Sequence, residues 1–154
     1  MEPDPLDAGG PTLERLRADH RALLEAVDTL EREVATPAPT LRAIADRLAA
    51  EYASHVIEED GVILPLLERQ LPDGSVTTEG LRQDHAELGA MLDAFRESLG
   101  LPASRERDEQ LRVQAQDFAA LLRSQLRKEE TLVFAIAGRQ ATRDRTQSPP
   151  GGRS

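Results

Sequence analysis

The sequence predicts an all-α fold, an antiparallel up-down-up-down four-helix bundle. Apolar residues recur at alternating spacings of three and four in four successive segments, which gives each segment an apolar face of helical period. The connections between the segments are short, and a short connection returns the chain beside the helix that it has just left. Only 3% of the residues are aromatic, so small aliphatic side chains must build the core, and this composition favours helices over a sheet.

The first helix is expected to begin at Thr12, whose side chain can cap it. The connection 35–40 ends it, because this connection contains Pro37 and Pro39. The expected apolar face carries Leu13, Leu16, His20, Leu23, Val27, Leu30 and Val34.

The second helix is expected to begin after Thr40, a second candidate cap. Pro65 predicts a kink or a break in its last turns, and the turn formed by residues 71–74 closes it. The expected core face carries Leu41, Ile44, Leu48, Tyr52, His55, Glu59, Val62 and Leu66.

The third helix is expected to begin through Thr77 or Thr78 and to stop at Gly100 and Pro102. Its core face carries Leu81, His85, Leu88, Leu92, Phe95 and Leu99.

The fourth helix is expected to begin at Ser104 and to end near Gly138. Its core face carries Leu111, Ala115, Phe118, Leu122, Gln125, Glu129, Leu132 and Ile136. Residues 12–138 are therefore expected to form the bundle, between a flexible N-terminus at 1–11 and a disordered C-terminal tail at 139–154, which is too polar to bury apolar surface.

The composition excludes several classes of partner and site. The chain has no cysteine, so any metal must be bound through nitrogen or oxygen. The net charge of −9, with Arg interspersed among acids, disfavours a nucleic-acid or anionic membrane surface. No run approaches the roughly 20 apolar residues of a membrane span. Residues 1–11 lack the features of a signal peptide, so we expect a cytoplasmic protein. We also expect a monomer or a weak homo-oligomer.

The three histidines of the chain, His20, His55 and His85, all occupy expected core positions, as do Glu59 and Glu129. Three randomly placed histidines would all fall on a stripe of two positions in seven only about 2% of the time. Buried ionisable groups cost several kcal/mol without a partner, and a metal ion would satisfy all five. A single core histidine is more often held by a hydrogen bond, but the five residues together predict a metal site.

The expected heights of these residues agree with a shared site. His20 lies 14 residues before Val34, and His55 lies 15 residues after Thr40, so both are about 21 to 22 Å from the connection between them. Residues 16–20 also resemble residues 81–85, and Ser54-His55 with Glu59 resembles Ser124-Gln125 with Glu129, as if one helical hairpin occurred twice.

The pair His55 and Glu59 is spaced i,i+4, so the imidazole and the carboxylate project into one layer, and Glu129 has the same register on the fourth helix. Histidine and carboxylate without sulfur suit iron, manganese or zinc, and paired carboxylates in a bundle core suit a dinuclear iron or manganese centre best. Glu58 and Glu130 lie beside the core faces and are expected to be solvated charges. Tyr52, one turn before His55 on the same face, is expected to be an aromatic residue at the edge of the core, with metal ligation as the alternative.

These residues resemble the haemerythrin-like, or HHE cation-binding, domain family over residues 12–138. The resemblance is carried by His20 on the first helix, His55-x3-Glu59 on the second, His85 on the third and Glu129 on the fourth. It implies a cofactor of two non-haem iron ions, bridged by carboxylates and an oxo group, with manganese or zinc as alternatives. It also implies small diatomic or peroxide ligands, in oxygen binding, in sensing of oxygen or iron, or in reactions with nitric oxide or peroxide.

The chain departs from the respiratory haemerythrins, which have two more histidines where this sequence has Gly89 and Gln125. Gln125 offers only a weak neutral oxygen, and Tyr52 is the residue that can compensate, because phenolate is a good donor to ferric iron. Fewer imidazoles leave more open positions, so we expect reactivity, such as catalase-like chemistry, or sensing rather than oxygen carriage. The alternatives are a metal-free helical interaction module with structural histidines, and an iron-binding or storage protein.

Overall fold

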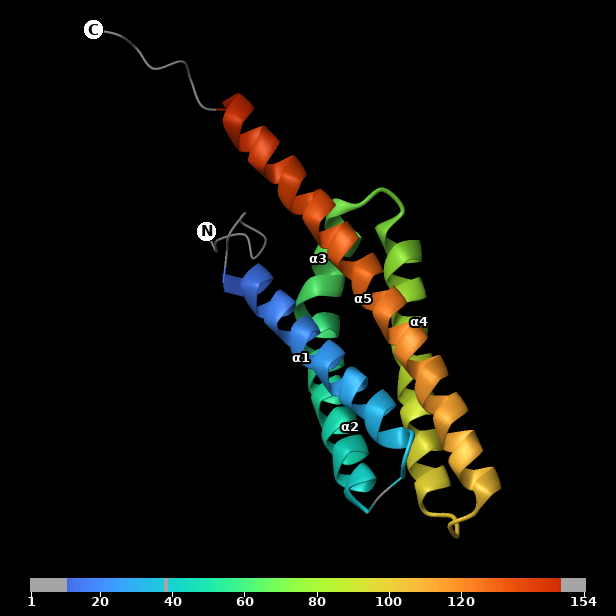
Figure 1. Cartoon of the computed structure of the whole chain (residues 1–154). Coiled ribbons are helices and arrows are strands. Elements are labelled where there is room, and N and C mark those ends of the chain that lie inside the picture. Colours follow the sequence, from blue (N-terminus) through green and yellow to red (C-terminus); the bar gives the residue numbers. More distant parts are fainter. Residues whose placement is uncertain (1–10, 38, 148–154) are drawn as a thin grey trace, which may run out of the picture.

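The computed structural model of the chain describes residues 11–37 and 39–147, and within these ranges every regular element is a helix. The all-α class predicted from the sequence is confirmed. The elements are α1 (Pro11–Val34), α2 (Thr40–Glu58), the π-helical segment η1 (Glu59–Ile63), α3 (Leu64–Gln70), α4 (Gly74–Leu99) and α5 (Arg105–Gln147) (Figure 1).

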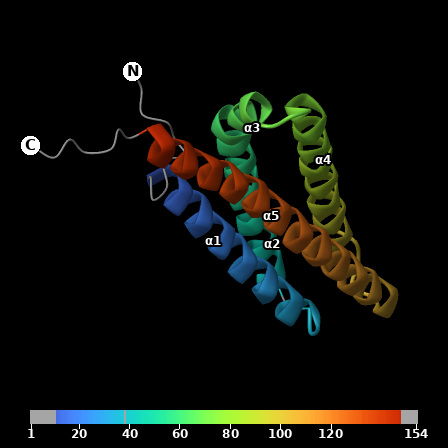
Figure 2. The ribbon, with the colours of Figure 1, turned by 90° about the horizontal axis from the view of Figure 1, so that it is seen from above.

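The helices form four long arms, since α2, η1 and α3 follow one another without a gap and together make one arm. The four arms pack side by side. α1 packs against α2 and α5, and α4 packs against the same two helices from the other side, while α3 contacts α4 and α5 (Figures 1 and 2). Each arm therefore packs against at least two others, as expected of a helical bundle. Within the described residues, none of the helices combines the length and the apolar character that crossing a membrane requires.

The core consists of two apolar clusters with a polar layer between them. The larger cluster contains the buried apolar residues of α1, α2, α4 and α5 on one side of the layer, including Leu23, Leu48, Leu88 and Leu122. The smaller cluster contains Leu16, Ile63, Leu64, Leu66, Leu67, Leu81, Val133 and Ile136. On each arm the polar core residue lies between members of the two clusters, as His20 does between Leu16 and Leu23. The apolar clusters hold the polar layer away from bulk water.

The predicted core faces are largely confirmed, with errors after the two glutamates. Val62 is 42% exposed, and its neighbour Ile63 is 3% exposed. On α5, Leu132 is only partly buried and Val133 is fully buried. The core face thus continues four residues after Glu59 and Glu129, not three. Ile44 and Leu99 are also only partly buried, and the side chain of Leu13 lies outside the described residues.

The irregularity expected at Pro65 is found immediately before it, in η1. The backbone N–H of Leu64 donates to the carbonyl of Glu59, five residues earlier, as in a π-helix. Pro65 has no N–H, and its ring would collide with the carbonyl of residue 61 in a regular α-helix. The wider turn removes this collision and carries Glu59 and Ile63 on the same face.

Two of the expected caps are wrong, and one is confirmed. α1 begins at Pro11, before Thr12, and the N-cap of α2 is Pro39, with no side-chain capping bond from Thr40. At the start of α5 the Ser104 hydroxyl accepts a hydrogen bond of 3.0 Å from the backbone N–H of Arg107, which is the capping contact that the sequence predicts.

α4 begins earlier than Thr77 or Thr78, directly after Asp73. Asp73 adopts the left-handed conformation with φ 55°, and Gly74 approaches α3 so closely that a Cβ there would lie 2.4 Å from the carbonyl oxygen of Glu68. Because of this tight turn, α4 begins directly at Gly74. The hydroxyl of Thr78 instead donates to the carbonyl of Ser75 inside the first turns. The expected stop at Gly100 is confirmed.

α5 continues to Gln147, so the expected end near Gly138 is wrong (Figure 1). A glycine inside a helix costs only about 0.5 to 1 kcal/mol, and no proline follows before Pro149, so nothing in the sequence stops the helix at Gly138. Residues 1–10 and 148–154 lie outside the described residues, and the flexible terminus and tail expected there stay predictions.

Candidate metal centre

The polar layer brings together the five residues on which the sequence analysis concentrated. His20 comes from α1, His55 from α2, Glu59 from η1, His85 from α4 and Glu129 from α5, and none is more than 5% exposed. One ligand atom from each of His20, His55, Glu59 and Glu129 lies within 4.8 Å of the others, as a metal site requires. All four helical arms therefore contribute to one cluster of imidazoles and carboxylates.

The Glu59 carboxylate faces all three imidazoles. Its Oε1 lies 3.3 Å from His20 Nε2 and 2.7 Å from His55 Nε2. Its Oε2 lies 3.0 Å from His85 Nε2. One oxygen of the carboxylate thus faces the first two histidines, and the other faces the third.

The Glu129 carboxylate repeats this division of its oxygens. Its Oε2 lies 3.3 Å from His20 Nε2 and 3.9 Å from His55 Nε2. Its Oε1 lies 3.1 Å from His85 Nε2. The two carboxylates together span a side that contains His20 and His55, which we call the two-histidine side, and a side that contains His85, which we call the one-histidine side.

Two further carboxylates orient two of the imidazoles from behind. Glu130 Oε1 lies 3.0 Å from His20 Nδ1, and Asp60 Oδ1 lies 3.2 Å from His85 Nδ1. When Nδ1–H donates to a carboxylate, the lone pair of a neutral imidazole lies on Nε2, which here faces other carboxylate oxygens. Two acceptors that face each other require a cation between them, either a proton or a metal ion.

Glu130 is therefore not only the solvated charge that the sequence analysis expected, although its side chain is 36% exposed. Glu58 fits that expectation, since it is 37% exposed and pairs with Arg15. The role of Asp60 was missed. The available signal was the repeat of acidic pairs, Glu59-Asp60 and Glu129-Glu130, in which the second acid of each pair contacts a histidine of another helix.

In the metal-free protein, protons take the place of the cation. Burial alone would lower the pKa values of His20 and His85, but hydrogen bonds to Glu129 and Glu59 outweigh it and raise both to about 10. Burial would raise the pKa of Glu59, but the close contacts of its carboxylate with the imidazoles of His20, His55 and His85 hold this pKa below its usual range. Burial raises the pKa of Glu129.

His55 has neither a carboxylate behind it nor a hydrogen bond at either ring nitrogen, although only 4% of the residue is exposed. Its contact with Glu59 is close but lacks hydrogen-bond geometry. Glu59 Oε2, Glu129 Oε2 and Gln125 Oε1 are also buried without a hydrogen-bond partner. Each such group costs about 1 to 3 kcal/mol. A metal ion would satisfy these nitrogen and oxygen donors together, so the residues fit the group that the sequence predicts.

Tyr52 and Gln125 border the same cluster. The Tyr52 hydroxyl donates to the backbone carbonyl of His85 at 3.5 Å, and burial with the charges of Glu129 and Glu59 raises its pKa, which keeps the phenol protonated. Gln125 donates from Nε2 to Glu129 Oε1 at 3.0 Å. Both residues can face a bound ion, and ligation by either of them stays a prediction.

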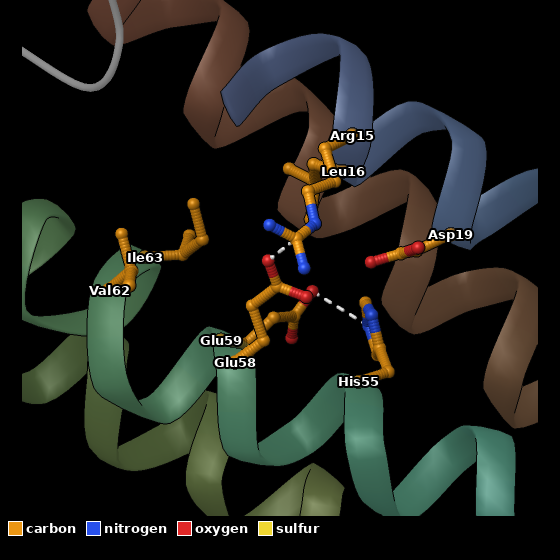
Figure 3. A pocket seen from close by; sticks show the side chains of 8 residues that line it. All are labelled: Arg15, Leu16, Asp19, His55, Glu58, Glu59, Val62 and Ile63. Carbon is orange, nitrogen blue, oxygen red and sulfur yellow. Dashed lines mark ion pairs between the residues drawn. The ribbon is translucent and has the colours of Figure 1, made fainter. Parts of the chain in front are cut away.

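A cavity of about 200 Å³ reaches the cluster from the surface between α1 and α2 with η1. Figure 3 shows Arg15 and Asp19 of α1 facing His55, Glu58 and Glu59 on the opposite wall. A small solute can therefore approach His55 and Glu59 from this side.

Comparison with known proteins gives one finding. Residues 12–137 match the family model described as Hemerythrin HHE cation binding domain, and this range contains all the residues of the cluster. Neither the curated proteins nor the solved structures give a significant match.

Proposed function

The chain belongs to the haemerythrin HHE cation-binding domain family, and from this premise we propose that it holds a non-haem di-iron centre that reacts with or senses dioxygen, peroxide or nitric oxide. The observation that carries the proposal is the division of oxygens at Glu59 and Glu129. Each carboxylate turns one oxygen to the two-histidine side and the other to the one-histidine side. This arrangement suits two carboxylates that bridge two neighbouring ions.

The proposed ligands differ between the two ions. One ion would take His20 and His55, and the other would take His85, with Tyr52 and Gln125 as further candidates. A donor set of imidazole and carboxylate without sulfur suits iron, with manganese or zinc as alternatives. The smaller number of strong ligands around the second ion leaves positions for an exogenous ligand, which favours reactivity or sensing over oxygen carriage.

The chain's own residues have definable tasks in this proposal. Bound iron would supply the redox and Lewis-acid chemistry towards dioxygen, peroxide or nitric oxide. Glu130 and Asp60 fix the ring orientation of His20 and His85. The Tyr52 hydroxyl donates to the backbone carbonyl of His85, and it would give up its proton only on binding the second ion as phenolate. The apolar clusters on both sides of the layer exclude bulk water.

The antiparallel up-down-up-down order of the helices and the metal site in the core belong to the same proposal. One observation that supports them is that consecutive arms lie side by side. Another is that His20 and His55, which are expected at one height, are in contact, and their ring centroids lie 5.0 Å apart. The cytoplasmic location also stays a prediction.

The decisive experiment is quantification of iron and manganese in purified protein, before and after anaerobic loading with ferrous iron. We expect about two ions per chain. A clearly substoichiometric metal content after loading would contradict the proposal and favour a metal-free interaction module, whereas many ions per chain would favour storage.

The role of Tyr52 has its own readout in the visible spectrum of the ferric protein. If Tyr52 is a ligand, phenolate gives a charge-transfer band that Tyr52→Phe abolishes. An unchanged spectrum in Tyr52→Phe would remove this residue from the ligand set. Catalase-like oxygen evolution from peroxide should disappear in His55→Ala, and its persistence would indicate adventitious iron.

A further inference from the structure

Two surface hollows between α1 and α2 converge on His55. The first is the cavity of about 200 Å³ in Figure 3, and the second has a volume of about 450 Å³ and extends along α2 towards residues 50–54. Arg15, Asp19, His55 and Glu58 line both hollows. The shared residues mark the point where the surface groove reaches the polar layer.

His55 is the side chain of the polar layer that lines both hollows of this groove. It is 4% exposed, it lines both hollows, and its two ring nitrogens have no hydrogen-bond partner. His20 and His85 differ, because Glu130 and Asp60 occupy their Nδ1 atoms. An unpartnered imidazole with the Glu59 carboxylate 2.7 Å away is a site to which a cation would transfer from water.

The charges around the groove favour cations over anions. Asp19, Glu51 and Glu58 contribute carboxylates to the lining, and Arg15 contributes a guanidinium. Arg15 Nε lies 3.1 Å from Glu58 Oε1, and this pair crosses the opening above Glu59 (Figure 3). The Arg15 side chain is 71% exposed, and ion pairs so exposed to water are weak and open readily.

We propose that the groove between α1 and α2 is the path by which divalent cations reach the metal centre, and that Arg15 closes it through its ion pair with Glu58. The proposal rests on the proposed metal-binding function and adds the route and its control. Asp19 attracts the cation at the opening, Arg15 repels it and covers the opening, and His55 with Glu59 receives it. Charge at the opening then governs the rate of loading and leaves the final metal content unchanged.

The test uses the full chain, freed of metal by chelation and mixed with Co²⁺ in a stopped-flow spectrometer at low ionic strength, with the visible absorbance of bound Co²⁺ as the readout. Arg15→Gln should load about three to ten times faster, and Asp19→Asn about three to ten times slower, since fixed charges at an opening change association rates by such factors. At 1 M salt both differences should disappear, because the charges are screened within about 3 Å. The matched controls are Arg112→Gln and Asp93→Asn, which change exposed charges on α5 and α4 away from the groove.

The opposite signs of the two effects separate the proposal from general loss of folding, which would move both variants in one direction. Loading rates of Arg15→Gln and Asp19→Asn equal to those of the controls, with normal metal content, would overturn the path and leave the proposed function intact. Absence of Co²⁺ binding by the wild-type protein would overturn both.

Discussion

The two halves of the molecule repeat one pattern but supply different ligands. The first half, α1 with α2 and η1, places His20 opposite His55 and Glu59, and the second half, α4 with α5, places His85 opposite Gln125 and Glu129. His55 has no hydrogen bond and borders the surface groove, whereas Gln125 is tied to Glu129. The repeated scaffold thus produces a cluster with unequal sides, a feature that suits two ions of unequal affinity.

The halves also depend on each other for the orientation of their histidines. Asp60 of the first half contacts His85 of the second, and Glu130 of the second half contacts His20 of the first. In each adjacent acidic pair, one carboxylate faces the centre and the other fixes an imidazole of the opposite half. Packing of the two halves against each other therefore completes both sides of the cluster.

The largest expected effect is loss of all bound metal in Glu59→Ala, because this carboxylate faces the histidines of both halves. His85→Ala should retain about one ion, since His85 serves the one-histidine side alone. The measurement is the metal content per chain after desalting of the loaded protein, with circular dichroism as a check that each variant is helical. Equal metal content in Glu59→Ala and His85→Ala would contradict the bridging arrangement.

A smaller effect is expected when the imidazoles lose the carboxylates behind them. Asp60→Asn and Glu130→Gln should each weaken metal affinity by about 10- to 100-fold, as loss of such outer partners does in other metal sites. Competition with a chelator of known affinity measures this change. Glu58→Gln is the matched control, because Glu58 lies two residues before Asp60 and pairs with Arg15 rather than with a histidine. An equal loss of affinity in Glu58→Gln would show that net charge, not imidazole orientation, is responsible.

Much of the fold and the polar cluster could be predicted because each depends on periodicity. Helical spacing placed His20, His55, His85, Glu59 and Glu129 on core faces, and the structure brings these five together. The error at Val62 recurs at Leu132, because spacings of three and of four residues both fit a helical face, and only the packing decides which residue is buried.

The contacts behind the histidines could not be predicted from periodicity. Asp60 and Glu130 lie next to the core face, where an acid normally points to water, and only the packing of another helix decides whether it meets an imidazole. The groove at Arg15 is equally beyond the sequence, since it depends on the separation of α1 and α2. The start of α4 was missed for a similar reason, because it depends on the close approach of Gly74 to α3.

The smallest expected effect comes from exchanging Gln125, which stands in the second half where His55 stands in the first. Gln125→His gives the second half the same ligand as the first and should raise the affinity for the more weakly bound ion on the order of tenfold, the lower end of what supporting residues contribute. His55→Gln should lower the affinity for the more tightly bound ion. Stepwise titration with Co²⁺ measures both constants. Because Gln125 is 2% exposed and already contacts Glu129, the new imidazole occupies the same layer. If both stepwise constants stay unchanged in Gln125→His while two ions still bind, the inequality of the two sides has another cause, and Tyr52 beside His85 is then the residue to exchange next.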